Sequence, residues 1–226
     1  MPGRKFLTRH EVADLLESSR KGSHPERNEC MILMAFIHGL RVSELLDLRL
    51  SDFNLRSRIT QVSRLKNGFS TIHPLTTREL RLLRNWLPVR RKIILRGHYE
   101  DEGWLFISDK ASCLSRQQFY NIITQAGRRA GLSVDVHPHM LRHACGYALA
   151  DNGVDTRLIQ DYLGHRNIRH TVQYTASSAA RFEGIWQPVS RHRKQHSDPK
   201  CKPAYVVQSI YCVEQKITCC LFGFLI

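Results

Sequence analysis

The hydrophobic pattern changes its period partway along the chain, and this change restricts the fold more than any other feature. Residues 58–65 and 69–75 alternate apolar and polar side chains around an Asn67-Gly68 pair, which is typical of a β-hairpin. On both sides of this segment, apolar residues recur at the spacing of α-helices. We therefore expect an α+β fold that is predominantly α-helical and carries a small antiparallel β-hairpin or sheet.

The helical segments can be placed from their periodicity and from the residues at their ends. Capping boxes should begin helices at Thr8 and Ser115, and a cap near Ser43 should begin a third. Pro88 should end or kink the helix that it interrupts, and residues 104–108 read as a short strand. Helices are expected over residues 7–20, 28–40, 42–48, 77–95, 115–130, 138–151, 155–163, 168–174 and 177–186.

The charge balance points to a polyanionic partner. The chain has 226 residues, enough for one large domain, and its 34 Lys and Arg against 20 Asp and Glu give a net charge of +14. Most of the basic residues are arginines, whose planar guanidinium suits contact with phosphate. Residues 1–188 remain strongly basic without the tail, so nucleic acid is the simplest partner.

Cysteine usage and hydropathy indicate the compartment. The 7 cysteines are odd in number, irregularly spaced and without a C-x-x-C pair, which disfavours a disulfide framework and a structural zinc site. Neither a transmembrane run nor the apolar core of a signal peptide is present, so we expect a reduced, cytoplasmic protein. Residues 189–226 read as a basic linker and a Cys-rich apolar tail, which we expect to be poorly ordered.

Six residues together suit chemistry at a phosphodiester. Two arginines can clamp the non-bridging oxygens, and a tyrosine hydroxyl can attack phosphorus once a histidine has taken its proton. A lysine on a hairpin can protonate the departing alkoxide, and none of these steps requires a metal or a nucleotide. The residues are Arg41, Lys66, His139, Arg142, His165 and Tyr174.

Taken singly, each of these residues also has an ordinary structural interpretation. Arg41 could be a solvated base, and Tyr174 could be a packing residue. His139 and His143 are spaced i, i+4 and could face a metal, but no H-E-x-x-H motif or third acidic ligand accompanies them. The functional interpretation therefore depends on the joint pattern.

That pattern resembles the tyrosine site-specific recombinases, or phage-integrase family, over about residues 5–186. The matching stretches are GLRVSELLDL, LKNG and HPHMLRHACGYALADNGVDTRLIQDYLGHRNIRHTVQYT. The stretches RLKNGFSTIHPL, LSRQQFY and LIQDYLGHRNIRHTVQYTASSAARF are similar to the small fimbrial phase-variation recombinases of that family. The resemblance implies a catalytic domain at residues 1–188 without a separate N-terminal DNA-clamping domain.

The resemblance also implies roles on the phosphate and leaving-group side of the reaction. Arg41 and Arg142 would clamp the scissile phosphate. Lys66 would be the general acid for the 5′-hydroxyl leaving group.

On the nucleophile side, the resemblance implies that Tyr174 attacks and forms a 3′-phosphotyrosyl link. His139 would be the base or proton shuttle, and His165 would hydrogen-bond the scissile phosphate. No cofactor or metal is expected.

The function implied is site-specific recombination at short inverted repeats in double-stranded DNA, inverting a promoter element that controls fimbrial phase variation. Four protomers would act through a Holliday junction, with accessory DNA-bending proteins, in the nucleoid.

On the helix at 115–130, the candidates for base contacts are Arg116, Gln117, Tyr120 and Gln125. The alternatives are a type IB topoisomerase-like or resolvase-like enzyme, a non-catalytic DNA-binding regulator, and a basic RNA-binding or zinc module.

Overall fold

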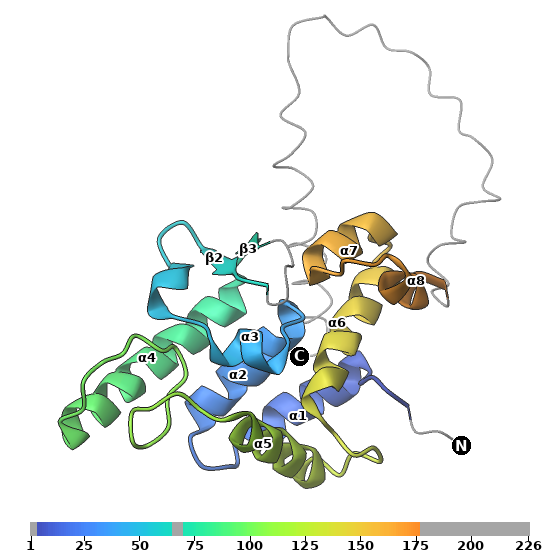
Figure 1. Cartoon of the computed structure of the whole chain (residues 1–226). Helices are drawn as coiled ribbons and strands as arrows, with labels where there is room; N and C mark the ends of the chain where they lie inside the picture. Colours follow the sequence, from blue (N-terminus) through green and yellow to red (C-terminus); the bar gives the residue numbers. More distant parts are fainter. Residues whose placement is uncertain (1–3, 65–69, 177–226) are drawn as a thin grey trace, which may run out of the picture. The chain divides into compact units, whose positions relative to one another are not determined.

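The computed structural model describes residues 4–64 and 70–176, which form a mostly helical body with a small sheet at one edge (Figure 1). The predicted Asn67-Gly68 turn, the helix at 177–186 and the tail at 189–226 lie outside the described residues. The elements are α1 (Arg9–Ser19), α2 (Pro25–Ile37), α3 (Val42–Leu46), η1 (Leu50–Asp52), β1 (Phe53–Asn54), β2 (Ile59–Val62), β3 (Thr71–Pro74), α4 (Thr77–Gly97), α5 (Arg116–Arg129), α6 (Pro138–Asp151), α7 (Thr156–Leu163) and α8 (Arg169–Ala176). The α+β class is confirmed.

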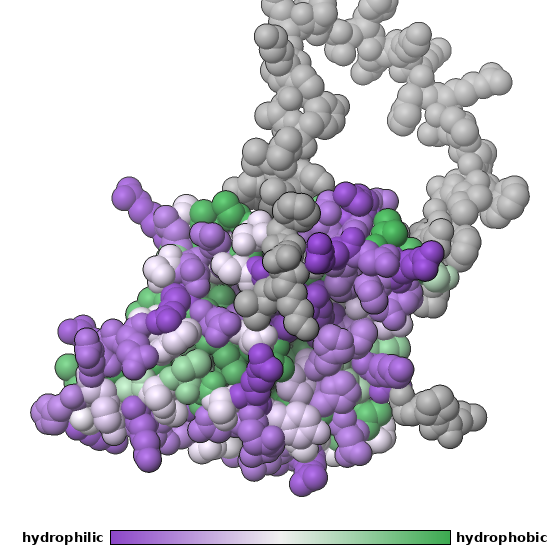
Figure 2. Space-filling model, viewed as in Figure 1, coloured by the Kyte–Doolittle hydropathy of each residue, from purple (hydrophilic) through white to green (hydrophobic). Residues whose placement is uncertain are grey.

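Helix α2 is the centre of the core. Every residue from Arg27 to Ile37 is buried, as expected for a helix that is apolar on nearly all sides. It packs against α1, α4 and α6. The surface of the protein is mostly hydrophilic on the face that Figure 2 shows.

Local sequence signals explain most helix boundaries. The capping boxes at Thr8 and Ser115 are present. Helix α3 begins at Val42 as expected, and the cap expected near Ser43 is Arg41, whose backbone N–H donates to the Glu44 carboxylate at 2.9 Å. The Glu44 carboxylate accepts the backbone N–H of the residue three positions before it, and this bond does not depend on the side chain at the cap. It therefore sets where α3 begins.

Pro88 does not end its helix, since α4 continues to Gly97. Buried side chains before and after the proline hold α4 in place, because Trp86 Nε1 donates to the Leu105 carbonyl at 2.8 Å and Arg90 Nε to the Trp104 carbonyl at 2.7 Å. These bonds also occupy backbone carbonyls of residues 104–108. The strand expected there is wrong, and the segment forms isolated bridges at Trp104 and Ile107.

The sheet has the strand order β1-β2-β3 and is antiparallel throughout. Thr60 on β2 pairs with Phe53 on one side and His73 on the other. The alternation of β2 is confirmed, because Thr60 and Val62 are buried whereas their neighbours are exposed. Strand β1 was not expected, since two residues are too few to show a period.

Helices α6, α7 and α8 pack together beside α2 (Figure 1). Pro138 occupies the first turn of α6, as expected, and Asp155 caps α7 by accepting backbone N–H bonds. In the described part of the chain Cys30 and Cys145 are buried free thiols and Cys113 is half-buried. No described helix is long and apolar enough to span a membrane.

Candidate active site

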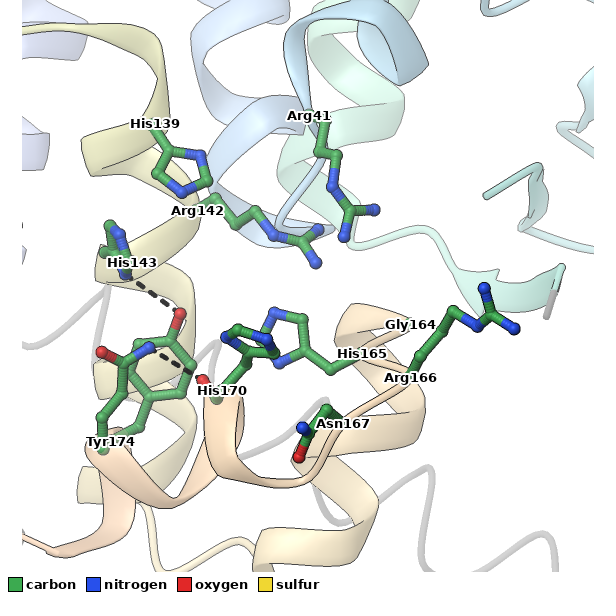
Figure 3. Close-up of a pocket in the computed structure, with 11 residues that line it drawn as sticks. Arg41, His139, Arg142, His143, Gly164, His165, Arg166, Asn167, His170 and Tyr174 are labelled. Atoms are coloured by element: carbon green, nitrogen blue, oxygen red, sulfur yellow. Dashed lines mark hydrogen bonds between the residues drawn. The ribbon is translucent and has the colours of Figure 1, made fainter. Parts of the chain in front are cut away.

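An open cavity of about 330 Å³ lies between the start of α3, helix α6, the turn after α7, and α8 (Figure 3). Predicted site residues from four parts of the sequence meet there. The lining residues are Arg41, His139, Arg142, His143, Gly164, His165, Arg166, Asn167, His170, Gln173 and Tyr174. Of the six residues predicted to act on the phosphodiester, only Lys66 is not placed, because it lies outside the described residues.

Arg142 is rigidly held although it is a cation, with 2% of its surface exposed. Its guanidinium donates to the carbonyls of Gly39 and Leu163, the second at 2.7 Å. Burial, together with the nearby Arg41, lowers the pKa of Arg142 to about 10, so it stays charged at neutral pH. Gly39 has φ +56°, a backbone conformation that favours glycine, and a Cβ there would clash with the side chain of Leu163. This position therefore requires glycine to present its carbonyl to the Arg142 guanidinium.

Glu44 organises the arginines. Its carboxylate lies 2.6 Å from Arg41 Nη1, 2.9 Å from Arg64 Nη1 and 3.9 Å from Arg142 Nη1. Burial alone would raise the pKa of Glu44, but the backbone N–H of Arg41 and the charge of Arg64 lower it. Among the described residues this cluster opposes three guanidiniums with one carboxylate, so the excess positive charge favours an anion in the cavity.

Arg64 is a buried residue that sequence reasoning missed. Its Nη2 donates to the carbonyls of His38 at 3.1 Å and Tyr162 at 2.5 Å. Nothing in the sequence distinguishes this arginine from the others, because its role depends on contacts with distant helices. Glu44 did carry a local signal, since its spacing from Arg41 is that of a capping box.

His165 enters the cavity from the turn after α7. Gly164 ends that helix with φ +66°, where a Cβ would lie 2.9 Å from Arg64 Cγ. The His165 ring is hydrogen-bonded through Nδ1 to Thr171 Oγ1 at 2.9 Å. Burial, followed by the charge of Arg142, lowers the pKa of His165 to about 3. The ring is therefore neutral at pH 7 and can hydrogen-bond without adding charge.

His139 and His143 lie one turn apart on α6, with ring centroids 4.6 Å apart. Desolvation, followed by the charge of Arg142, lowers the pKa of His139, which keeps the ring able to accept a proton. Residues 4–64 and 70–176 contain no group of three His, Cys, Asp or Glu side chains arranged to hold a metal ion.

Tyr174 is almost completely buried, with 1% of its surface exposed. Its Oη is hydrogen-bonded to His143 Nδ1 at 3.0 Å (Figure 3). Burial raises the pKa of Tyr174 to about 12, so the hydroxyl is protonated at neutral pH. Sequence reasoning considered His143 only as a metal ligand and missed this contact, which depends on how α8 packs on α6.

The four candidates for base contacts are not in the cavity. They are exposed on α5, whose opposite side is buried through Phe119 and Ile123. Gln117 is hydrogen-bonded to Asn121 of the same helix at 2.9 Å. The exposed residues are Arg116, Gln117, Tyr120 and Gln125.

Comparisons with known proteins agree with this geometry. Residues 5–181 match the model of the phage integrase family. The chain is 55% identical over 194 residues to the type 1 fimbriae regulatory protein FimB of Escherichia coli K12, covering 86% of this chain and 94% of the relative. It is 51% identical over 187 residues to FimE of the same strain, covering 83% and 93%.

Solved structures show the same fold. The XerA recombinase is 26% identical with a TM-score of 0.68, covering 87% of this chain and 67% of that chain. The XerH site-specific recombinase, in a post-cleavage complex with its palindromic difH substrate, is 27% identical with a TM-score of 0.67. That match covers 79% of this chain and 51% of that chain.

Proposed function

Because the chain belongs to the phage integrase family of tyrosine recombinases, enzymes that cleave and religate DNA, we propose that it recombines DNA at short inverted repeats and switches fimbrial expression. The similarity to FimB and FimE over most of both chains supports the fimbrial assignment. Inversion of a promoter element between two such repeats would change expression without loss of DNA.

The observation that carries this proposal is the convergence of Arg41, Arg142 and Tyr174 on one cavity. The guanidiniums of Arg41 and Arg142 both point into it (Figure 3). They would bind the non-bridging oxygens of the scissile phosphate and stabilise the charge that develops on them. The excess positive charge around Glu44 fits a substrate that brings the missing anion.

The proposed cleavage step uses Tyr174 as nucleophile. Its Oη–H bond breaks, the proton passes to His139, and Oη forms a bond to phosphorus. The bond from phosphorus to the 5′-oxygen breaks, and this oxygen takes a proton from Lys66. His165 hydrogen-bonds the phosphate during transfer. The 3′-phosphotyrosyl link preserves the energy of the broken ester, so the reverse step reseals DNA without ATP.

Recombination requires this cleavage and its reversal on strands of two DNA sites. We propose four protomers on two sites, a Holliday junction and help from accessory DNA-bending proteins. The exposed face of α5 is the candidate for sequence readout, because it projects Arg116, Gln117 and Tyr120 into solvent beside the basic body.

Covalent trapping tests the function. The protein and its Tyr174→Phe variant would be mixed, in EDTA, with DNA from the neighbourhood of the gene and quenched with strong detergent. The wild type should give a protein–DNA adduct on a denaturing gel, and Tyr174→Phe should give none while still shifting DNA in a native gel. Tyr99→Phe, at an exposed tyrosine outside the cavity, is the matched control and should keep the adduct.

Other outcomes identify the alternatives. Tight, salt-sensitive binding without an adduct, even after addition of cell extract, would favour a non-catalytic regulator. Relaxation of supercoiled plasmids that lack inverted repeats would favour a topoisomerase-like enzyme.

A further inference from the structure

One face of α6 is shaped to receive the ring of Tyr174. His143, Gly146 and Tyr147 follow the i, i+3, i+4 spacing that places side chains on one side of a helix. We call these three residues the Tyr174 seat. The Tyr147 ring meets the Tyr174 ring edge-on, with centroids 5.1 Å apart and planes at 82°.

Gly146 brings the helix backbone close to the ring. A Cβ at this position would lie 2.7 Å from three carbons of the Tyr174 ring, well inside van der Waals contact. The ring therefore lies where only glycine leaves room. The His165 ring also lies beside it, with centroids 6.2 Å apart and planes at 21°.

These contacts hold the ring of Tyr174, and its hydroxyl group makes a separate hydrogen bond to His143. Tyr174 Oη is hydrogen-bonded to His143 Nδ1 at 3.0 Å, and the Gln173 side chain also interacts with this hydroxyl and lowers its pKa. The hydroxyl thus lies on the wall of the cavity into which Arg41 and Arg142 point (Figure 3).

We propose that His143 is a positioning residue for the nucleophile, holding Tyr174 Oη toward the phosphate position by accepting its hydrogen bond at Nδ1. This inference rests on the proposed function. It adds a residue that acts through Tyr174 and does not itself touch the phosphate. His139 remains the proton acceptor in the proposed step.

The electrostatic surroundings favour this role over that of a base. The groups that face His143 are His139, Arg142, His137 and Lys5, together with the Tyr174 hydroxyl. Burial, then these neighbours, lowers the pKa of His143 to about 4. The ring is neutral at pH 7 and can accept the hydrogen bond at Nδ1 with its own proton on Nε2. With a pKa of about 4, this ring is a weaker base than an ordinary imidazole.

Single-turnover adduct formation tests the role. His143→Leu should slow adduct formation about 10–100-fold without changing DNA affinity, because a misplaced nucleophile loses near-attack geometry. His143→Asn should stay within a few-fold of wild type, since its Oδ1 can accept near the position of Nδ1. His98→Asn, at the exposed end of α4, is the control and should match wild type. A His143→Leu rate within twofold of wild type, or His143→Asn as slow as His143→Leu, would overturn the proposal.

A sulfur-bridged substrate separates the nucleophile from the leaving group. When sulfur replaces the 5′-bridging oxygen, the thiolate leaves without a proton, so Lys66→Ala should be rescued. His143→Leu should remain slow on this substrate. Rescue of His143→Leu would place its defect at the leaving group and contradict a role through Tyr174.

A measurement without DNA keeps this inference separate from the proposed function. With ring-labelled tyrosine, the Cζ resonance of Tyr174, assigned from its loss in Tyr174→Phe, should shift in His143→Leu and return in His143→Asn. Melting temperatures would confirm that each variant is folded. An unmoved resonance in His143→Leu overturns the positioning role, whereas the absence of any wild-type adduct overturns the proposed function.

Discussion

Gly146→Ala should have opposite effects on stability depending on whether the ring of Tyr174 is present. In the wild-type background the added methyl group overlaps the ring, with its carbon 2.7 Å from three ring carbons. In the background of Tyr174→Ala no ring remains to overlap. The same substitution should then act only on the helix.

The two contributions can be estimated separately. Alanine in place of glycine inside a helix stabilises the protein by about 0.5–1 kcal/mol. Ordinary carbon contacts are about 3.5–4.0 Å, so the ring must move by roughly 1 Å, and overpacking of this kind costs about 1–3 kcal/mol. We expect a net loss centred on about 1 kcal/mol (range about 0–2.5 kcal/mol) with Tyr174 present and a gain of about 0.5–1 kcal/mol with Tyr174→Ala.

Urea denaturation of the four proteins in this double-mutant cycle measures the free energy of unfolding in each background. Thermal melts provide a second readout, since about 1 kcal/mol corresponds to about 2–4 °C in a domain of this size. If Gly146→Ala changes stability by the same amount in both backgrounds, within about 0.5 kcal/mol, the ring does not lie on Gly146 and the Tyr174 seat is wrong.

Three further predictions concern the charged groups of the cavity. Arg142→Ala should reduce the rate of adduct formation about 10²–10³-fold while a gel shift shows nearly unchanged DNA binding, as expected for a transition-state donor; an unaltered rate would refute the assignment. Glu44→Gln should lower the free energy of unfolding by about 3–5 kcal/mol, because the buried guanidinium of Arg64 and the half-buried one of Arg41 lose their counter-charge, and urea denaturation that gives equal stabilities would contradict this. The folded-state pKa of His165 lies below its unfolded value of 6.5, so its contribution to stability is present above pH 6.5 and decreases as the pH falls toward about 3. Melts between pH 7.5 and 5 should therefore show a smaller loss of stability for His165→Asn than for wild type, and parallel curves would argue against a buried neutral ring.

The elements that sequence reasoning placed correctly are those whose signals are local. The helix at 138–151 was predicted with its observed bounds, because Pro138 marks its first turn and its apolar residues keep helical spacing. The capping box at Ser115 likewise depends on residues four apart or closer. Such signals do not require knowledge of what packs against them.

The errors arose where distant contacts decide the structure. Pro88 was expected to end or kink its helix; α4 does not end there, because bonds from Trp86 and Arg90 to the carbonyls of Leu105 and Trp104 hold it on both sides of the proline. The same bonds remove carbonyls that a strand at 104–108 would have used. Tertiary contacts therefore overruled the local preference at both places.

The candidate site shows the same division. The joint pattern of Arg41, Arg142, His165 and Tyr174 was visible in the sequence, and the structure brings these residues to one cavity. His143 was noted only for its i, i+4 spacing from His139, because its contact with Tyr174 arises only when α8 packs on α6. The role of Lys66 stays a prediction.

Arg64 links three separate parts of the fold around the site. Its guanidinium fastens the end of β2 to the last residue but one of α7 and to the carbonyl that follows α2. Lys66 follows Arg64 after a single residue, and His165 follows the α7 carbonyl by three. A displacement of the chain at the end of β2 would therefore be passed through Arg64 to the turn that carries His165.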